Sequence, residues 1–206
     1  MKELIKQIKK VENSETAKII DQRLKEFEEM NKKGNEDWFS ELCFCILTAN
    51  SKAKNAINIQ KELGKQGFIC NSQKNICDCI KRNKHRFHNN KSKFIVLARQ
   101  QKNIKDIIKK ELEPREWLVK NIKGLGFKES SHFLRNVGYK DYAIVDRHIM
   151  NILKDNNLLK EKPKSLNKRV YLEIENTLKN LGDKINMDQA RLDLYLWYIK
   201  TGEILK

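Results

Sequence analysis

Helix breakers are scarce along this chain, and this scarcity limits the possible folds more than any other feature. The 206 residues include two prolines and eight glycines, so few positions force the backbone to turn. Apolar residues recur at helical spacing, most clearly at Phe39, Leu42, Cys43, Ile46 and Leu47. We therefore predict an all-α protein without a sheet, in which this segment lies at the centre of a core.

The same spacing, together with capping residues, sets the expected helices. Ser14 is a candidate N-cap for the second helix and Asn35 for the third. A short extended approach is expected over 141–146, ahead of a helix that begins near Asp146. The expected helices cover 2–12, 15–31, 36–49, 53–64, 72–82, 91–110, 114–123, 128–137, 146–155, 165–181 and 187–200.

The charge balance points to a polyanionic partner. The chain carries 43 basic and 27 acidic residues, a net charge of +16, and nucleic acid is the commonest polyanion that such a chain meets. A generic lysine-rich protein is the alternative. No apolar run approaches the ~20 residues of a membrane helix. The chain also starts directly in a charged stretch, so we expect a cytoplasmic protein.

The five cysteines are an odd number and predict reduced thiols. Cys43 and Cys45 lie in the apolar helix and are expected to be small core residues. Cys70, Cys77 and Cys79 form a cluster that invites comparison with metal sites, but zinc and iron–sulfur sites usually need four ligands at characteristic spacings. We therefore expect no metal.

The segment 81–93, KRNKHRFHNNKSK, stands out for its basic residues. It holds six lysines or arginines and a single aromatic residue, Phe87, and it has no apolar stripe. We predict an exposed basic loop leading into the helix 91–110. Basic residues with an interleaved aromatic suit backbone neutralisation and base stacking. An ordinary solvated loop is the alternative.

The strongest signal is EWLVKNIKGLGFKESSHFLRNVGY, residues 116–139, where two apolar-periodic helices flank a Gly-Leu-Gly turn. Gly124 and Gly126 allow a tight turn, and Leu125 can plug the core of the pair. The amides near Gly126 and the start of the next helix can hold a phosphate. This hairpin can therefore grip a DNA backbone without reading sequence, although many αα-hairpins have glycine there for structural reasons alone.

Two residues near this hairpin suggest chemistry. Lys128 lies at the start of the second helix, where the positive end of the helix dipole disfavours an ammonium. A neutral amine can attack C1′ of a sugar. Asp146 is an expected N-cap, whose carboxylate can stabilise positive charge developing on a sugar. Taken singly, a lysine at a helix start and an aspartate at an N-cap are usually structural; the combination behind a hairpin is more specific.

These residues resemble the helix-hairpin-helix DNA glycosylase superfamily with its Gly/Pro-rich loop and catalytic aspartate. The match is closest to the type 2 8-oxoguanine DNA glycosylase/lyases. Gly-Leu-Gly, Lys128 and the Ile-Val-Asp-Arg-His of 144–148 carry it. Further matching segments are 44–60, 86–95 and the ending 192–206. The resemblance spans nearly the whole chain. It implies a single glycosylase unit over 1–206, with its hairpin at about 115–138 and the catalytic aspartate region at 139–155. The family fold has two helical subdomains with the active site in the cleft between them.

The resemblance implies a monomeric enzyme that acts on double-stranded DNA containing 8-oxoguanine or abasic sites, associated with the nucleoid through DNA. The damaged base is flipped into a pocket. Lys128 attacks C1′ to give a Schiff base, Asp146 assists, and β-elimination nicks the strand. Phe87 and Trp197 are expected to sandwich the base, and Lys206 to distinguish 8-oxoguanine from guanine. Judged from the residues alone, Trp197 shares a helical stripe with Ala190 and Leu194 and fits a core position.

Two departures from the superfamily pattern matter. Members with an iron–sulfur cluster carry four cysteines after the catalytic aspartate, whereas no cysteine follows Cys79; we therefore expect no cluster and no other cofactor. The loop has Gly138 but no proline. Two alternatives remain at this stage: a non-catalytic hairpin DNA-binding protein, and a glycosylase for another base such as an oxidised pyrimidine or uracil. Asn50 and Ser51 are candidates for filling the gap left by a flipped base.

Overall fold

Every regular element of the protein is helical, as the sequence predicts. The computed structural model describes residues 1–206, and no strand forms, including at 141–146. The chain divides into two compact units. The terminal unit combines residues 1–29 with 134–206, and the central unit contains residues 30–133. No helix is long and apolar enough to cross a membrane.

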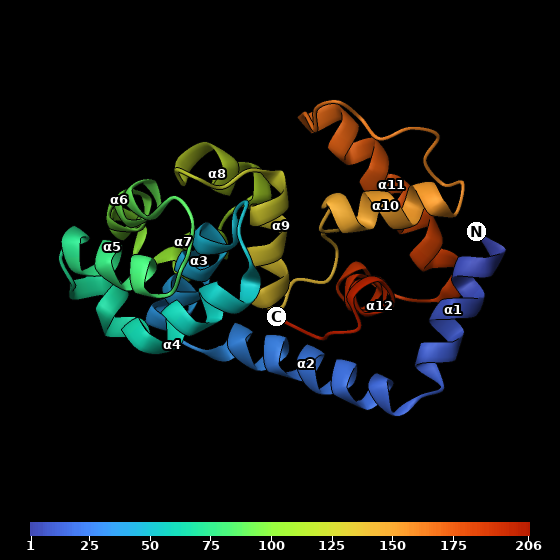
Figure 1. Cartoon of the computed structure of the whole chain (residues 1–206), viewed down its shortest axis with the longest axis horizontal. Helices are drawn as coiled ribbons and strands as arrows, with labels where there is room; N and C mark the ends of the chain where they lie inside the picture. The colour runs from blue at the N-terminus through green and yellow to red at the C-terminus, as the bar shows by residue number, and fades with distance from the viewer. The chain divides into compact units, whose positions relative to one another are not determined.

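The helices are labelled in Figure 1. Their bounds are α1 Lys2–Glu12, α2 Glu15–Lys32, α3 Asn35–Thr48, α4 Ala53–Cys70, α5 Gln73–Arg82, α6 His88–Ala98, the 3-10 turn η1 Arg99–Gln101, α7 Ile104–Ile108, α8 Pro114–Asn121, α9 Phe127–Asn136, α10 Arg147–Asp155, α11 Lys168–Ile185 and α12 Gln189–Thr201.

Several predicted ends are wrong for local reasons. Asn35 is the first residue of α3 instead of its cap, and its side-chain oxygen accepts the Lys105 N–H at 2.8 Å, at the start of α7. The helix predicted to end at 64 does stop there, because Gly64 has a non-helical conformation with a φ of 59°, but a second helical segment that was not predicted follows this kink to Cys70, the end of α4. The helix predicted over 91–110 is divided into α6, η1 and α7.

The core of the central unit is built around α3. Residues Trp38 to Thr48 of this helix are all buried, as its nearly continuous apolar sequence predicts. Its aromatic side chains contact α9: the rings of Trp38 and Phe133 are 6.0 Å apart, and those of Phe44 and His132 are 5.6 Å apart, both edge to face. α3 therefore supports the helix that carries Lys128.

The core of the terminal unit is built around α12, which lies among α1, α10 and α11 (Figure 1). Leu192, Leu194, Tyr195 and Leu196 are almost fully buried. One charged pair is buried with them: Arg135 donates to the Asp193 carboxylate, and its guanidinium lies 5.0 Å from the centre of the Phe27 ring. α12 thus serves as the central helix against which the Asp146 region is packed.

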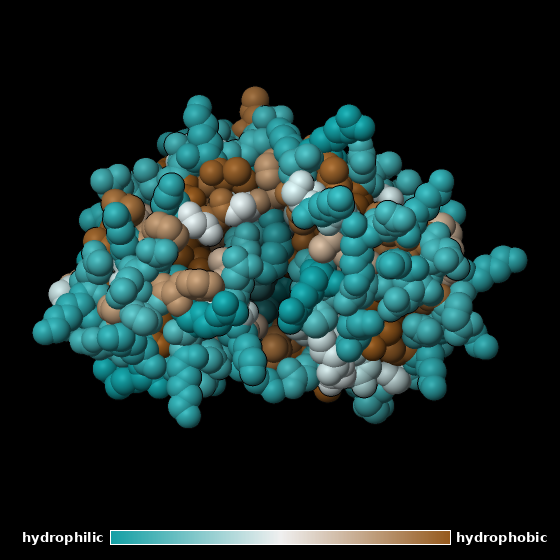
Figure 2. All heavy atoms as spheres, turned by 45° about the horizontal axis from the view of Figure 1, so that its top comes forward, coloured by the Kyte–Doolittle hydropathy of each residue, from teal (hydrophilic) through white to brown (hydrophobic).

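The surface agrees with the basic composition. Figure 2 shows that hydrophilic side chains cover most of the face in view, with only small apolar patches between them. Long lysine and arginine side chains supply much of such a surface in a chain with 43 of these residues. Such a surface suits contact with a phosphate backbone.

Candidate active site

The predicted hairpin is formed by α8, α9 and the turn between them. Gly124 has a φ of 95°, and a Cβ atom there would lie 2.6 Å from the Phe94 ring. Both the backbone conformation and the packing therefore require glycine. Leu125 is 6% exposed, so the prediction that it plugs the core of the helix pair is confirmed. Leu118 and Ile122 are also buried, as their spacing indicates.

The hairpin amides are already engaged within the hairpin itself. The Leu125 N–H donates to the Ile122 carbonyl at 3.2 Å. The Gly126 N–H donates to Glu129 Oε2 at 3.3 Å. Glu129 is the third residue of α9, so it reaches back to the start of its own helix as in a capping box. A phosphate that binds the Gly126 amide must displace this carboxylate.

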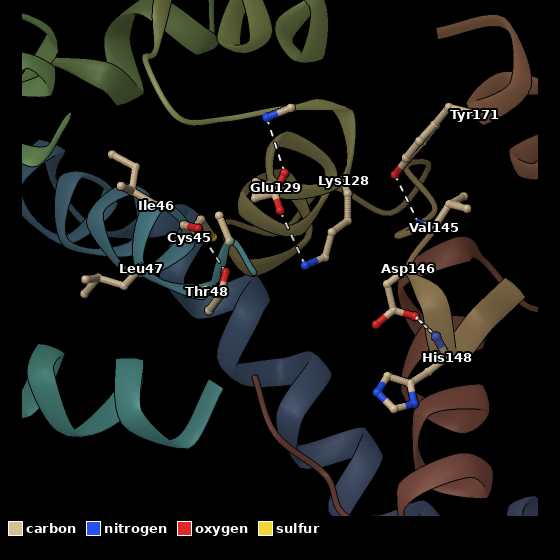
Figure 3. A network of polar contacts seen from close by, with 12 residues as sticks. Cys45, Ile46, Leu47, Thr48, Lys128, Glu129, Val145, Asp146, His148 and Tyr171 are labelled. Carbon is tan, nitrogen blue, oxygen red and sulfur yellow. Dashed lines mark hydrogen bonds and ion pairs between the residues drawn. The ribbon is translucent and has the colours of Figure 1, made fainter. Parts of the chain in front are cut away.

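Lys128 is the second residue of α9 and projects from its first turn. Its side chain is 29% exposed, and its Nζ lies 3.5 Å from Glu129 Oε1. Figure 3 shows Glu129 with one oxygen directed at a backbone nitrogen and the other at the Lys128 amine. The amine is thus accessible while its position is restrained by one carboxylate.

Asp146 caps α10 as the sequence predicts. Its Oδ1 accepts the N–H groups of His148 and Ile149, both at 2.8 Å. Two such bonds hold the carboxylate in one orientation at the positive end of the helix. They also use only one of its oxygens, so Oδ2 is left for an external group.

The segment before Asp146 is held by α11. The Tyr171 hydroxyl accepts the Val145 N–H at 3.1 Å and donates to the Ala143 carbonyl at 2.8 Å, and Glu175 accepts the Ala143 N–H at 3.0 Å. Figure 3 shows Tyr171 above the Asp146 loop. No sequence pattern singles out Tyr171, because an aromatic residue at a periodic helix position is expected to fill the core.

Trp197 lies beside the helix that Asp146 caps. Its ring meets the His148 ring edge to face, with centroids 5.1 Å apart. Trp197 is half-buried, and its Nε1 is buried without a hydrogen-bond partner. Trp197 is therefore neither a fully buried core residue nor a fully exposed surface residue. Lys206 is half-buried in the segment that follows α12, beyond the left-handed Gly202.

Phe87 occupies an unusual backbone position in the central unit. It is 47% exposed, has a φ of 59°, and precedes α6. A left-handed conformation is costly for an aromatic residue. This backbone conformation sets the direction in which the Phe87 ring leaves the chain. The Arg86 guanidinium lies 4.9 Å from the ring centre, so the residue combines an exposed aromatic face with a cation.

Comparison with known proteins gives the family. Residues 20–187 match the family model described as 8-oxoguanine DNA glycosylase. The chain belongs to the 8-oxoguanine DNA glycosylase family. An 8-oxoguanine DNA glycosylase/AP lyase of Methanocaldococcus jannaschii is 52% identical, with 98% of this chain and 99% of that protein covered. A protein of the same name from Korarchaeum cryptofilum is 41% identical, with 99% and 98% covered.

The structures agree with the sequences. The crystal structure of the Methanocaldococcus jannaschii 8-oxoguanine glycosylase/lyase, in complex with a 15mer DNA containing 8-oxoguanine, superposes with a TM-score of 0.96. It is 51% identical and covers 98% of this chain and 99% of that chain. The Thermotoga maritima 8-oxoguanine DNA glycosylase has a TM-score of 0.94 at 36% identity, with 100% and 99% covered.

The basic segment of this 8-oxoguanine DNA glycosylase family member differs from the prediction. It is not one exposed loop, because α5 and α6 take up most of 81–93 and leave only 83–87 between them. Lys91 is 4% exposed and His85 is 5% exposed. Lys91 is buried because it donates to backbone carbonyls at the end of α3, a contact that no local pattern signals.

The cysteines of this family member have ordinary surroundings. Cys43, Cys45 and Cys79 are buried, and the first two are core residues as predicted. Cys77 Sγ lies 3.3 Å from Asn89 Oδ1, and Cys70 is exposed. Burial is the main cause that raises the pKa of the Cys79 thiol to about 12. No group of three or more His, Cys, Asp or Glu side chains is placed to hold a metal ion.

Proposed function

We propose that this protein removes 8-oxoguanine from double-stranded DNA and then cleaves the strand at the resulting abasic site, with Lys128 as nucleophile and Asp146 as its assistant. The observation that carries the proposal is the 52% identity over 98% of the chain to a protein named 8-oxoguanine DNA glycosylase/AP lyase. The accessible amine at the start of α9 and the oriented carboxylate at the start of α10 support the two roles.

In the first step, the lone pair of a neutral Lys128 amine attacks C1′ of the damaged nucleotide. The C1′–N9 bond breaks, and the base leaves with that electron pair and takes up a proton. Positive charge develops on the sugar as the bond breaks, and the Asp146 carboxylate stabilises it. Loss of a proton from the new amine and opening of the C1′–O4′ bond give the Schiff base.

In the second step, the Schiff base makes the C2′ proton acidic. Removal of this proton and breakage of the C3′–O bond release the 3′ part of the strand with a 5′-phosphate, which is β-elimination. Water then hydrolyses the remaining Schiff base and frees Lys128. An amine and a carboxylate supply all of this chemistry, so the proposed reaction uses no iron–sulfur cluster or other cofactor.

Recognition of the base is assigned to three further residues. The exposed ring of Phe87 and the half-buried ring of Trp197 are suited to stacking on a flipped base. Lys206 is proposed to distinguish 8-oxoguanine from guanine. Gly124, Leu125 and Gly126 are proposed to approach the phosphate backbone. The protein would act as a monomer at the nucleoid of the cytoplasm, on duplexes with 8-oxoguanine or abasic sites.

The test is reductive trapping of the Schiff base. Wild-type protein, incubated with an 8-oxoguanine or abasic duplex and sodium borohydride, is expected to form a covalent protein–DNA complex on a denaturing gel. Lys128→Gln is expected to form none. Lys123→Gln is the matched control, because it removes the same charge from an exposed position of the same hairpin, and it should still be trapped.

Two results would overturn the proposal: no trapped complex with the wild type, or an undiminished one with Lys128→Gln. The first result with intact DNA binding would indicate a hairpin protein that binds without catalysis. A panel of duplexes with uracil and oxidised pyrimidines decides the substrate, since we expect 8-oxoguanine to be removed fastest.

A further inference from the structure

Tyr171 and Glu175 hold the segment that leads into Asp146, although the proposed reaction gives neither of them a role. The Tyr171 hydroxyl accepts the Val145 N–H at 3.1 Å and donates to the Ala143 carbonyl at 2.8 Å. Glu175 Oε1 accepts the Ala143 N–H at 3.0 Å. Three backbone groups of this short segment are therefore bonded to two side chains of α11.

The two side chains take the place of a neighbouring strand. In an extended segment, the N–H and C=O groups of residues two apart point to the same edge, and here that edge carries the groups of Ala143 and Val145. Residues four apart lie on one face of a helix, so Tyr171 and Glu175 reach this edge together. Asp146 continues the extended course, with φ −114° and ψ −179°, before α10 begins.

These contacts lie in the interior of the terminal unit. Ala143, Val145 and Tyr171 are almost fully buried, so water has little access to replace a bond that is lost. A buried backbone group without a partner costs free energy, and the chain moves to satisfy it. Loss of the Tyr171 hydroxyl is therefore expected to displace the segment that it holds.

The position of the Asp146 carboxylate depends on this segment, because Asp146 directly follows Val145. Figure 3 shows Tyr171 directed at the Val145 nitrogen, immediately before Asp146. On the other side, the His148 and Ile149 N–H groups fix the carboxylate relative to α10, both at 2.8 Å. The contacts with α11 fix the chain that enters this cap, so the carboxylate is held from both directions.

We propose that Tyr171 and Glu175 are positioning residues for catalysis: by holding the segment 143–145, they place the Asp146 carboxylate where it stabilises the positive charge that develops on the sugar. This inference rests on the proposed function of Asp146. A displacement of about 1 Å in a catalytic group can lower a rate about 10²-fold. A hydroxyl that sets the course of the backbone can therefore govern base removal.

The test is the single-turnover rate of 8-oxoguanine release, measured with excess protein on an 8-oxoguanine duplex. Tyr171→Phe removes the hydroxyl and keeps the ring. The matched control is Tyr195→Phe, which removes the hydroxyl of an equally buried tyrosine of the same unit, where that hydroxyl interacts with Arg191. We expect Tyr171→Phe to slow release by about 10- to 100-fold, and Tyr195→Phe to release the base at nearly the wild-type rate.

A double-mutant cycle separates positioning from general damage to the fold. In the Asp146→Asn protein, the carboxylate that Tyr171 positions is absent. We therefore expect Tyr171→Phe to slow release by about twofold or less in this background. The full loss of rate in the Asp146→Asn background would show that Tyr171 supports the fold without acting through Asp146, and would overturn the inference.

Glu175 gives a second test, which decides if Tyr171→Phe does not fold. Glu175→Ala removes the acceptor of the Ala143 N–H, whereas Glu175→Gln keeps an oxygen that can accept it. We expect release to be slower in Glu175→Ala and to recover most of the wild-type rate in Glu175→Gln. Equal rates in these two variants would contradict the proposal. Circular dichroism checks that each variant is folded.

A folded Tyr171→Phe protein that releases 8-oxoguanine as fast as Tyr195→Phe would also overturn the inference. Failure of the proposed function itself is recognised separately. The wild-type protein would then release no 8-oxoguanine, or Asp146→Asn would release it as fast as the wild type.

Discussion

At the scale of single residues, the buried ion pair of the terminal unit is the most sensitive position. The Arg135 and Asp193 side chains are 5% and 8% exposed, and Arg135 also bonds to the Asn136 side chain at 3.2 Å. Charges removed from water this completely are tolerated because they are paired. The pair joins the end of α9 to the central helix α12, so its loss affects the packing behind the Asp146 region.

We expect Asp193→Ala to lower the free energy of unfolding by about 3–5 kcal/mol, because Arg135 is left as an uncompensated buried charge. The measurement is urea unfolding followed by circular dichroism. Glu173→Ala is the control: it breaks the Arg169–Glu173 pair, whose side chains are 87% and 60% exposed, and should change stability by about 0.5 kcal/mol or less. Equal losses in both variants would contradict this view of the buried pair.

Local sequence identifies some single residues and misses others. Asp146 could be predicted because an N-cap depends on the residues next to it: an apolar run before and helical spacing after. Lys91 and Tyr171 could not, since their partners are backbone groups 42 to 45 and 26 to 28 residues away. A lysine in a basic stretch predicts a solvated side chain unless the fold supplies carbonyls to hold it.

At the scale of elements, two helices of the terminal unit begin at an aspartate N-cap. Asp146 caps α10, and Asp188 caps α12 by accepting the Arg191 N–H at 2.8 Å. Asparagine caps a helix about as well as aspartate, because its side-chain oxygen accepts the same bonds. Replacing each aspartate by asparagine therefore separates capping from chemistry.

We expect Asp146→Asn and Asp188→Asn to fold with thermal midpoints close to that of the wild type. Only Asp146→Asn should lose base removal, by about 10²–10⁴-fold, the usual contribution of a positioned catalytic carboxylate. The measurements are a thermal scan and single-turnover release of 8-oxoguanine. Comparable activity in the two variants would show that Asp146 only caps its helix.

Element prediction failed mainly where lysine and asparagine lie inside a helix. The first turn of α6, His88 to Lys91, has no apolar stripe and was expected to be loop. It is helical because Phe87 turns the chain in a left-handed conformation and Lys91 is anchored on α3. At Gly64 the predicted break is real, but the helical segment that follows it to Cys70 was missed. At the start of α6, a tertiary contact and a single turned residue outweigh the local pattern.

At the scale of the whole molecule, the net charge can be recognised from the sequence, whereas the division into two units cannot. The terminal unit joins residues 1–29 with 134–206, and no periodicity reveals that segments so far apart share a core. The net charge of +16 follows from the composition alone, whatever the fold. It supplies an attraction to the phosphate backbone that does not depend on base sequence.

This attraction predicts a steep salt dependence of DNA binding. Each phosphate neutralised releases condensed counterions, so contact with about six phosphates should lower the affinity for duplex DNA about 10³-fold between about 50 and 200 mM salt. The Lys128→Gln variant allows the measurement by fluorescence anisotropy without strand cleavage. A thermal scan over the same salt range controls for loss of fold. A nearly flat response would contradict binding through the phosphate backbone. The same slope with undamaged and 8-oxoguanine duplexes would show that base recognition adds to the electrostatic contribution of the phosphate contacts without replacing it.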